Sequence, residues 1–259
     1  ILPCVEEKAL YDLRRGDGAA NAGFTKTGLS EKPVKVFNCP SRSGRFVISG
    51  ITVYNVGDYA GVMAGWNDPN WSEFEYRLGY GPRQSTNDPR AKEQTTVWTG
   101  ILVKGGQIGA GSPPQVYKFP RVGFKNIEDG ASHTILLAEK AIDANFYTLT
   151  STAIWPYWEM YGYYTGADWP VMRIFGPRLP GAANPRVEIP VKADTDQRDY
   201  PRGFVSPVYE HGFGAAHPGI FCAVFGDGST RNISSAADLI ILDQLGKRAD
   251  QTNPSLESL

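Results

Sequence analysis

The sequence predicts one α+β domain over residues 1–259, built on an antiparallel β-sheet with a helix at its start and another at its end. Two observations favour this class. The 29 glycines and 19 prolines exceed the usual share of these residues and interrupt the chain often, which favours short elements joined by long loops. In addition, short β-prone runs lie between two segments whose apolar residues recur at helical spacing.

The N-terminal half is expected to hold one helix and most of the strands. Apolar residues at helical spacing over residues 2–13 predict a helix that ends at Gly16. Short runs rich in β-branched and aromatic residues then predict strands. These strands are expected at residues 34–37, 46–48, 51–54, 95–103, 122–127 and 134–138.

The chain from residue 219 to residue 246 is expected to form a hairpin followed by a helix. Residues 220–225 and 229–234 are the two strands, and Asp227 and Gly228 form a type I′ turn, in which both central residues need positive φ. The helix is expected over residues 236–245, with serines before it as caps and a glycine after it as a stop.

Residues 155–210 read as an aromatic, loop-rich insertion into this domain. Flat rings on loops can stack on sugars or fill a partner's pocket, so the aromatic cluster is a candidate binding surface, although such rings more often form a small core of their own. The residues of this candidate surface are Trp155, Tyr157, Trp158, Tyr161, Tyr163, Tyr164 and Trp169.

Charge and hydropathy exclude two classes of partner. The 26 Lys and Arg residues balance 27 Asp and Glu residues, so the chain lacks the basic stripe that nucleic-acid binding requires. Its longest apolar runs, such as residues 135–138, are far shorter than the roughly 20 residues of a membrane span. The chain also begins at Ile1 without an initiator Met, so we expect that residues upstream have been removed or left out.

The three cysteines, Cys4, Cys39 and Cys222, show no C-x-x-C spacing, so neither a zinc site nor a thioredoxin-type motif is predicted. A disulfide between Cys4 and Cys39 and pairing with a missing part of the protein both remain open. Because Cys222 lies inside an apolar strand, we expect it to be a buried free thiol.

No cofactor and no metal ion is expected. The sequence contains no phosphate-binding loop and no convincing dinucleotide motif. Asp194, Asp196 and Asp199 resemble the start of a calcium loop, but the glycine and the closing glutamate of such a loop are missing, so a solvated acidic loop is favoured.

No catalytic residue is predicted among the histidines. His217 and Asp227 would be the tempting acid–base pair, but an extended strand of ten residues holds its ends about 33 Å apart, whereas general-base chemistry needs direct hydrogen-bond contact. We therefore expect His217 to anchor the entry to its strand by hydrogen bonds. An enzyme would need His211 or His217 to meet a carboxylate and a nucleophile from other segments.

Four segments of the chain, in this order, are similar to segments of one known family. They are the stretch from Leu2 to Tyr11, the run around Cys39 and Pro40, the run from 127 to 136 with Asp129 and Gly130, and His217 followed after nine residues by Asp227 and Gly228. These segments resemble the prepilin-like proteins abundant in planctomycete bacteria, with their His-X9-Asp-Gly signature. His133 and Cys4 depart from the residues usual in that family.

The resemblance implies an extracytoplasmic head domain of pilin or pseudopilin kind at the cell envelope. It also implies a short basic leader and a hydrophobic helix of about 20 residues upstream of Ile1, processed by a prepilin peptidase. The role implied is structural, with other pilin-like subunits as partners and the motif residues as structural elements. The alternatives are a binding module for carbohydrate or another solute and, less favoured, a cell-surface hydrolase.

Overall fold

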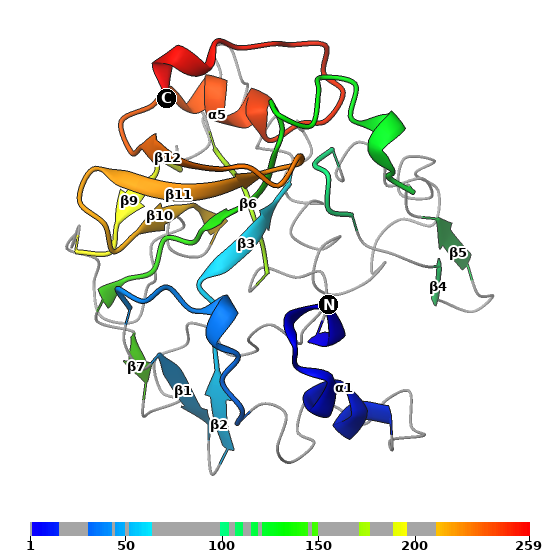
Figure 1. Ribbon diagram of the computed structural model, residues 1–259, viewed down its shortest axis with the longest axis vertical. Helices are drawn as coiled ribbons and strands as arrows, with labels where there is room; N and C mark the ends of the chain where they lie inside the picture. Colours follow the sequence, from blue (N-terminus) through cyan, green and yellow to red (C-terminus); the bar gives the residue numbers. More distant parts are fainter. Residues whose placement is uncertain are drawn as a thin grey trace.

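The computed structural model describes residues 2–15, 31–42, 45–49, 52–63, 99–103, 107–110, 115–118, 121–144, 147–149, 171–176, 189–195 and 211–259. Figure 1 shows a sheet with helix α5 (Leu239–Leu245) above it and helix α1 (Lys8–Arg15) at the opposite end. Short 3₁₀ helices accompany them: η1 (Leu2–Val5), η2 (Lys35–Phe37), η3 (Phe124–Asn126) and η7 (Leu256–Ser258).

The main sheet has five strands in the order β12-β11-β6-β3-β8. Its pairs are antiparallel except for the parallel pair of β3 and β8. The mixed sheet with few helices agrees with the predicted α+β class. The strands are β3 (Tyr59–Val62), β6 (Ile135–Glu139), β8 (Met172–Arg173), β11 (Ile220–Phe225) and β12 (Thr230–Ser234).

Three smaller sheets complete the described strands. They comprise β2-β1-β7, with β1 (Phe46–Ser49), β2 (Thr52–Asn55) and β7 (Thr148–Leu149); β10-β9, with β9 (Lys192–Ala193) and β10 (Gly214–Ala215); and the hairpin of β4 (Gln107–Ala110) and β5 (Gln115–Lys118). Strands β8 and β9 both fall within the predicted insertion. Part of that insertion is therefore integrated into the sheets.

One face of the main sheet carries the hydrophobic core. Ala138 of β6 lies beside both Ala60 and Ala223 in the register, and these three small residues let α5 and neighbouring aromatic rings pack closely. Leu242 and Leu245 of α5 are almost fully buried in the same cluster. Side chains alternate along a strand, so the residues next to these alanines point to the opposite face.

A buried charge network fastens the loops to this sheet. Arg42, whose side chain is fully buried, donates from Nε and Nη2 to the carboxylate of Asp194 at 2.5 and 2.8 Å and from Nη2 to the Lys140 carbonyl at 2.6 Å. Burial alone would lower the pKa of Arg42, but the hydrogen bonds and charge of Asp194 outweigh it and raise that pKa. Asp58 lies 3.9 Å from Arg42 and also pairs with Arg45.

The expected strand at 34–37 is wrong, because this segment forms η2. Phe37 donates its N–H to the Val34 carbonyl at 2.9 Å, which closes a 3₁₀ turn. Val34 is buried while Val36 is 57% exposed, so the apolar residues follow a period of three rather than two. The bend lets the Phe37 carbonyl accept the N–H of Asp58, at 2.7 Å.

Two further expected strands are wrong. Residues 122–127 hold only η3, whose Phe124 is 79% exposed, and Gly123 donates its N–H to the side chain of Asn126 instead of to a neighbouring strand. Residues 99–103 form no strand, since the carbonyls of Thr99 and Gly100 accept hydrogen bonds from Arg248. Residues 95–98 lie outside the described part of the chain.

The expected strands at 46–48, 51–54 and 134–138 are confirmed as β1, β2 and β6. The predicted first helix is divided into η1 and α1, and Glu6 lies between them at a φ of 62°. The last helix begins at Leu239, three residues later than expected. Its cap is Asp238, whose carboxylate accepts the Ile240 N–H at 2.7 Å.

The C-terminal hairpin is confirmed, but its turn is not of type I′. Gly228 has a φ of 85°, as expected, whereas Asp227 is not at positive φ. Gly228 donates its N–H to the Phe225 carbonyl, and Phe225 donates to Ser229, which makes a three-residue loop closed by a glycine bulge. The expectation for Cys222 is half wrong: the thiol is free but only partly buried, because the side chain points away from the core.

Gly228→Ala should lower the free energy of unfolding by about 1 kcal/mol, since an alanine at this φ strains the backbone although its Cβ would meet no atom within 4 Å. Gly123→Ala is the matched control, because Gly123 has an extended φ of −124°. Urea denaturation of both variants measures the difference. Equal stability of the two variants would contradict the assigned turn.

Arg42→Met should lower the free energy of unfolding by about 3–5 kcal/mol, because it leaves the buried Asp194 carboxylate without its cation, whereas Asp58 keeps Arg45. Lys8→Met is the control: Lys8 pairs with Asp12 on the surface, where the two side chains are 74% and 42% exposed, and its loss should change stability little. Denaturation of both variants tests this. A stability loss no larger for Arg42→Met than for Lys8→Met would show that the network does not hold the fold.

Candidate functional site

A row of polar side chains crosses the main sheet on the face opposite the core. Tyr59 of β3 pairs with Glu139 of β6, and Cys222 of β11 pairs with Asn232 of β12. The registers of β11 and β6 place Cys222 beside Glu139. Each of these residues is next to a core residue in its strand. Because successive side chains of a strand point to opposite faces, the four residues share the face away from the core.

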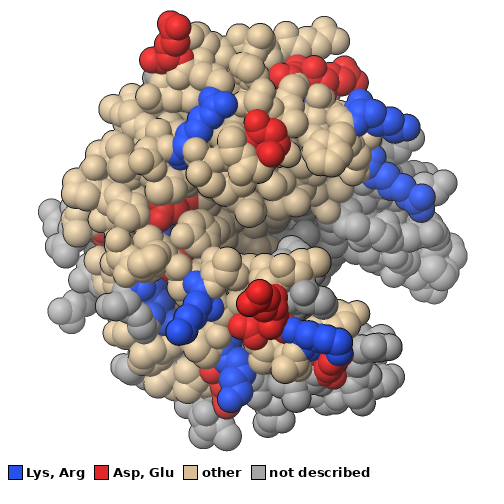
Figure 2. Space-filling model, in the orientation of Figure 1, with Lys and Arg blue, Asp and Glu red and all other residues tan. Residues whose placement is uncertain are grey.

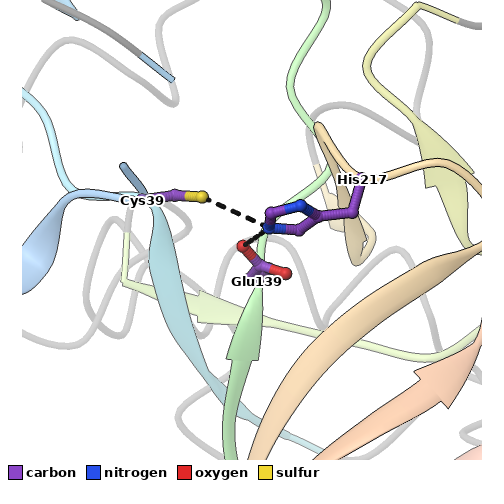
Figure 3. Close-up of side chains that lie close together, drawn as sticks. All are labelled: Cys39, Glu139 and His217. Carbon is purple, nitrogen blue, oxygen red and sulfur yellow. Dashed lines mark hydrogen bonds and ion pairs between the residues drawn. The ribbon is translucent and has the colours of Figure 1, made fainter. Parts of the chain in front are cut away.

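Cys39 and His217 cover Glu139 in this row. The His217 Nε2 atom lies 3.5 Å from Cys39 Sγ and 3.4 Å from Glu139 Oε1. Figure 3 shows Cys39 and His217 pointing toward each other from opposite sides, with Glu139 rising from the end of β6 between them. The side chain of His217 is 30% exposed and that of Glu139 only 1%, so the carboxylate lies at the bottom of the cluster.

Hydrogen bonds from the backbone fix two of these three residues. Cys39 donates its N–H to Asp58 Oδ2 at 2.7 Å, and its carbonyl accepts the Arg42 N–H at 2.9 Å. Glu139 Oε2 accepts the Cys222 N–H at 2.8 Å, which leaves Oε1 facing His217. The buried charge network therefore also sets the position of the Cys39 thiol.

Burial and the Glu139 charge dominate the electrostatics of the site. Burial raises the pKa of the Cys39 thiol, and the Glu139 carboxylate raises it further. The same two causes raise the pKa of Cys222. Burial together with the charges around it, Cys39 and Glu139 among them, raises the pKa of Tyr59 to about 12. The metal-free site thus favours neutral thiols.

Two kinds of chemistry use a cysteine, a histidine and a carboxylate. A nucleophilic relay needs the thiol on one ring nitrogen and the carboxylate on the other, whereas here both face Nε2. A metal ion needs lone pairs that converge on one point. The three ligand atoms lie within 4.8 Å of one another, which matches the second arrangement.

The other predicted motif residues lie apart from this cluster. Asp227 is at the far end of β11 from His217, so the two do not meet within the strand. The Ser229 side chain and then the Ser229 N–H, which the Asp227 carboxylate accepts, lower the pKa of Asp227. Asp129 accepts backbone N–H groups from Asp250 and Gln251. Of the expected motif residues, Cys39 and His217 reach the cluster.

Two acidic residues of the site region were missed or misread in the sequence. Glu139 closes the apolar run of β6, and a lone acid at the end of a buried strand was its only signal. Asp194 was expected in a solvated loop but is 1% exposed, because Arg42 binds it in the interior. Asp196, Asp199 and the seven aromatic residues of the candidate binding surface lie outside the described part of the chain.

Sequence comparison places the chain in a family. The family described as a protein of unknown function (DUF1559), SBP_bac_10, matches residues 1–239. No curated protein matches the chain, and no solved structure matches it. The family match spans all three segments that supply Cys39, Glu139 and His217. Because the match covers most of the 259 residues, the chain belongs to the DUF1559 family of proteins of unknown function.

Proposed function

We propose that this chain is the extracytoplasmic head of a prepilin-like protein of the cell envelope and that its role is structural, within an assembly of like subunits. Membership of the DUF1559 family supports the proposal. So does the order of the four segments that resemble prepilin-like proteins. None of the helices in the described residues is long and apolar enough to span a bilayer. The resemblance to prepilin-like proteins implies a hydrophobic helix upstream, which would attach the head to the membrane.

A structural role is supported by the hydrogen bonds that the turns of the signature segments make to each other and to the C-terminal segment. Gly226 and Asp227 donate their N–H groups to the carbonyls of Thr134 and Ala131, so the turn of the His-X9-Asp-Gly segment packs on the turn that follows Asp129. Asp129 in turn donates to the Arg248 carbonyl and accepts two N–H groups from the segment after it. The signature therefore ties the hairpin and the C-terminal segment to the sheet.

The surface supports protein partners rather than nucleic acid. Figure 2 shows Lys and Arg interspersed with Asp and Glu on the face in view, with no stripe of one sign among the described residues there. Nucleic-acid binding would require such a basic stripe. Like subunits of near-zero charge can pack together without strong mutual repulsion.

The proposal is tested on the whole gene product in its native host. We expect the protein in the envelope fraction, exposed to external protease in intact cells, and cross-linked by a short lysine-reactive reagent into a ladder of multimers. Deletion of the host's prepilin peptidase should leave an unprocessed precursor and abolish the ladder. A cytoplasmic, monomeric protein unaffected by that deletion would contradict the proposal, and a cytoplasmic protein of the same host serves as the protease control.

We also propose that the chain is not an enzyme with Cys39 as its nucleophile. A nucleophilic cysteine needs a lowered pKa and access to its substrate. Cys39 is 2% exposed, and burial raises its pKa. In addition, the Glu139 carboxylate contacts the same nitrogen of His217, Nε2, as the Cys39 thiol. A nucleophilic relay needs the two groups on different ring nitrogens.

Alkylation of the native, metal-free protein tests this. Iodoacetamide should modify Cys4 first, Cys222 more slowly and Cys39 last. Cys4 is exposed, whereas Cys39 is buried and its burial raises the pKa of its thiol. Peptide mass spectrometry against time measures the order. In denaturant the three cysteines should react alike. Fast, selective modification of Cys39 in the folded protein would favour the hydrolase alternative.

A further inference from the structure

We propose that Cys39, Glu139 and His217 form a binding site for a divalent metal ion of the zinc class. One ligand atom from each residue lies within 4.8 Å of the other two. We assign the ligand atoms as Cys39 Sγ, His217 Nε2 and the Glu139 Oε1 atom that faces this nitrogen. The fourth position is open to water. The three residues come from the turn after η2, the end of β6 and the turn before β11 (Figure 3).

Two of the three distances between the ligand atoms match the edges of a tetrahedral zinc site. A tetrahedral ion with bonds of about 2.3 Å to sulfur and about 2.0 Å to nitrogen and oxygen sets the sulfur–nitrogen edge at about 3.5 Å and the nitrogen–oxygen edge at about 3.3 Å. The observed distances are 3.5 Å from Cys39 Sγ to His217 Nε2 and 3.4 Å from His217 Nε2 to Glu139 Oε1. The third pair, the Cys39 sulfur and the Glu139 carboxylate, lies within 4.8 Å, and a bound ion would bring it to a sulfur–oxygen edge of about 3.5 Å.

Hydrogen bonding alone accounts poorly for this arrangement. His217 Nε2 carries one hydrogen or one lone pair, and it cannot form a good hydrogen bond to both the thiol and the carboxylate at once. The 3.4 Å from His217 Nε2 to Glu139 Oε1 is also longer than a strong charged hydrogen bond. A cation at the centre would satisfy all three groups together.

The chemistry of the ligands selects the metal class. A cysteine thiolate and an imidazole suit zinc, whereas magnesium and calcium take oxygen ligands. A zinc ion with one thiolate, one carboxylate and one neutral imidazole makes a site of zero net charge. Zero net charge matters here because Glu139 is 1% exposed and Cys39 is 2% exposed, and a buried net charge is costly.

The surroundings hold the ligands in place, as the second layer of a metal site does. The Cys222 N–H occupies Glu139 Oε2, so Oε1 is presented as a single-oxygen ligand. Asp58 and Arg42 fix the backbone of Cys39. Because His217 is 30% exposed, an ion and a water molecule can approach from its side.

This inference goes beyond the proposed envelope role and does not depend on it. It also departs from the sequence-based expectation of no metal, which rested on the lack of C-x-x-C spacing. The ligands here are 178 residues apart from Cys39 to His217, so no local motif could reveal them.

The test uses the untagged chain, freed of metal by chelator and dialysed against reducing buffer with micromolar ZnSO4. We expect one zinc ion per chain by elemental analysis and a rise in melting temperature that chelator reverses. With CoSO4 in place of zinc, we expect intense visible bands of four-coordinate cobalt and a thiolate-to-cobalt charge-transfer band. These readouts do not require any activity of the protein.

Variants of the ligands identify the site. Cys39→Ser should abolish the charge-transfer band, and His217→Ala should weaken zinc binding more than the roughly 10- to 100-fold typical of a second-layer residue. Glu139→Gln keeps the shape and the acceptor for the Cys222 N–H while removing the charge. Cys4→Ser and His133→Ala are matched controls, because neither side chain belongs to the three-residue cluster and Cys4 is an exposed free thiol, and both should bind zinc as the parent chain does.

Three outcomes would overturn the proposal. These are no zinc binding by the folded parent chain, binding that persists unchanged in both Cys39→Ser and His217→Ala, and loss of binding in the two control variants alone. Circular dichroism of each variant separates loss of the site from loss of the fold. If Cys39→Ser does not fold, His217→Ala decides the matter, because its partly exposed side chain can be removed without opening the core.

Discussion

Most of this structure depends on the buried hydrogen bonds and ion pair of the Arg42 guanidinium. Its partners, the Asp194 carboxylate and the carbonyl of Lys140, come from segments distant in sequence. Asp58 adds a second carboxylate and itself binds the N–H of Cys39. Burying these charged groups costs free energy, and removing one partner of the buried ion pair is strongly destabilising. The buried network therefore fixes one relative arrangement of the turn, the start of β3, the end of β6 and the segment after β9.

The candidate site follows from that arrangement and from the parity of the sheet. The core needs small residues where α5 packs on β6 and β11, and their neighbours Tyr59, Glu139 and Cys222 are consequently aligned on the other face. A shift of one residue in the register would send Glu139 into the apolar core. The turn at Cys39, held by Arg42 and Asp58, then covers this row and buries the carboxylate beside His217.

Local chemistry explains which parts of the fold were predictable. The hairpin of β11 and β12 and the positive φ of Gly228 follow from nearby residues alone, as do β1, β2 and β6. The strand expected at 34–37 failed because a distant contact with Asp58 outweighed a weak local alternation. The predicted start of the last helix was three residues early, because Asp238 caps the helix in place of the serines before it. The turn between β11 and β12 was predicted at the right residues but with the wrong type.

The candidate site was less predictable than the fold. Cys39 and His217 stood out through the family resemblance, but their meeting depends on contacts across 178 residues. Glu139 has no signal beyond an acid at the end of an apolar run. Asp194 was misread because its partner Arg42 is 152 residues away. A sequence shows which side chains are able to bind a metal, and only the folded chain shows which of them converge.

X-ray absorption of the zinc-loaded chain tests the central claim, that the buried network holds the Cys39 thiol against Glu139 and His217 as one metal site. We expect a single sulfur neighbour at about 2.3 Å and nitrogen or oxygen neighbours at about 2.0 Å. The sulfur neighbour should vanish in Cys39→Ser and persist in Cys4→Ser. A first shell of nitrogen and oxygen alone in the parent chain, or a sulfur neighbour that survives in Cys39→Ser, would contradict it.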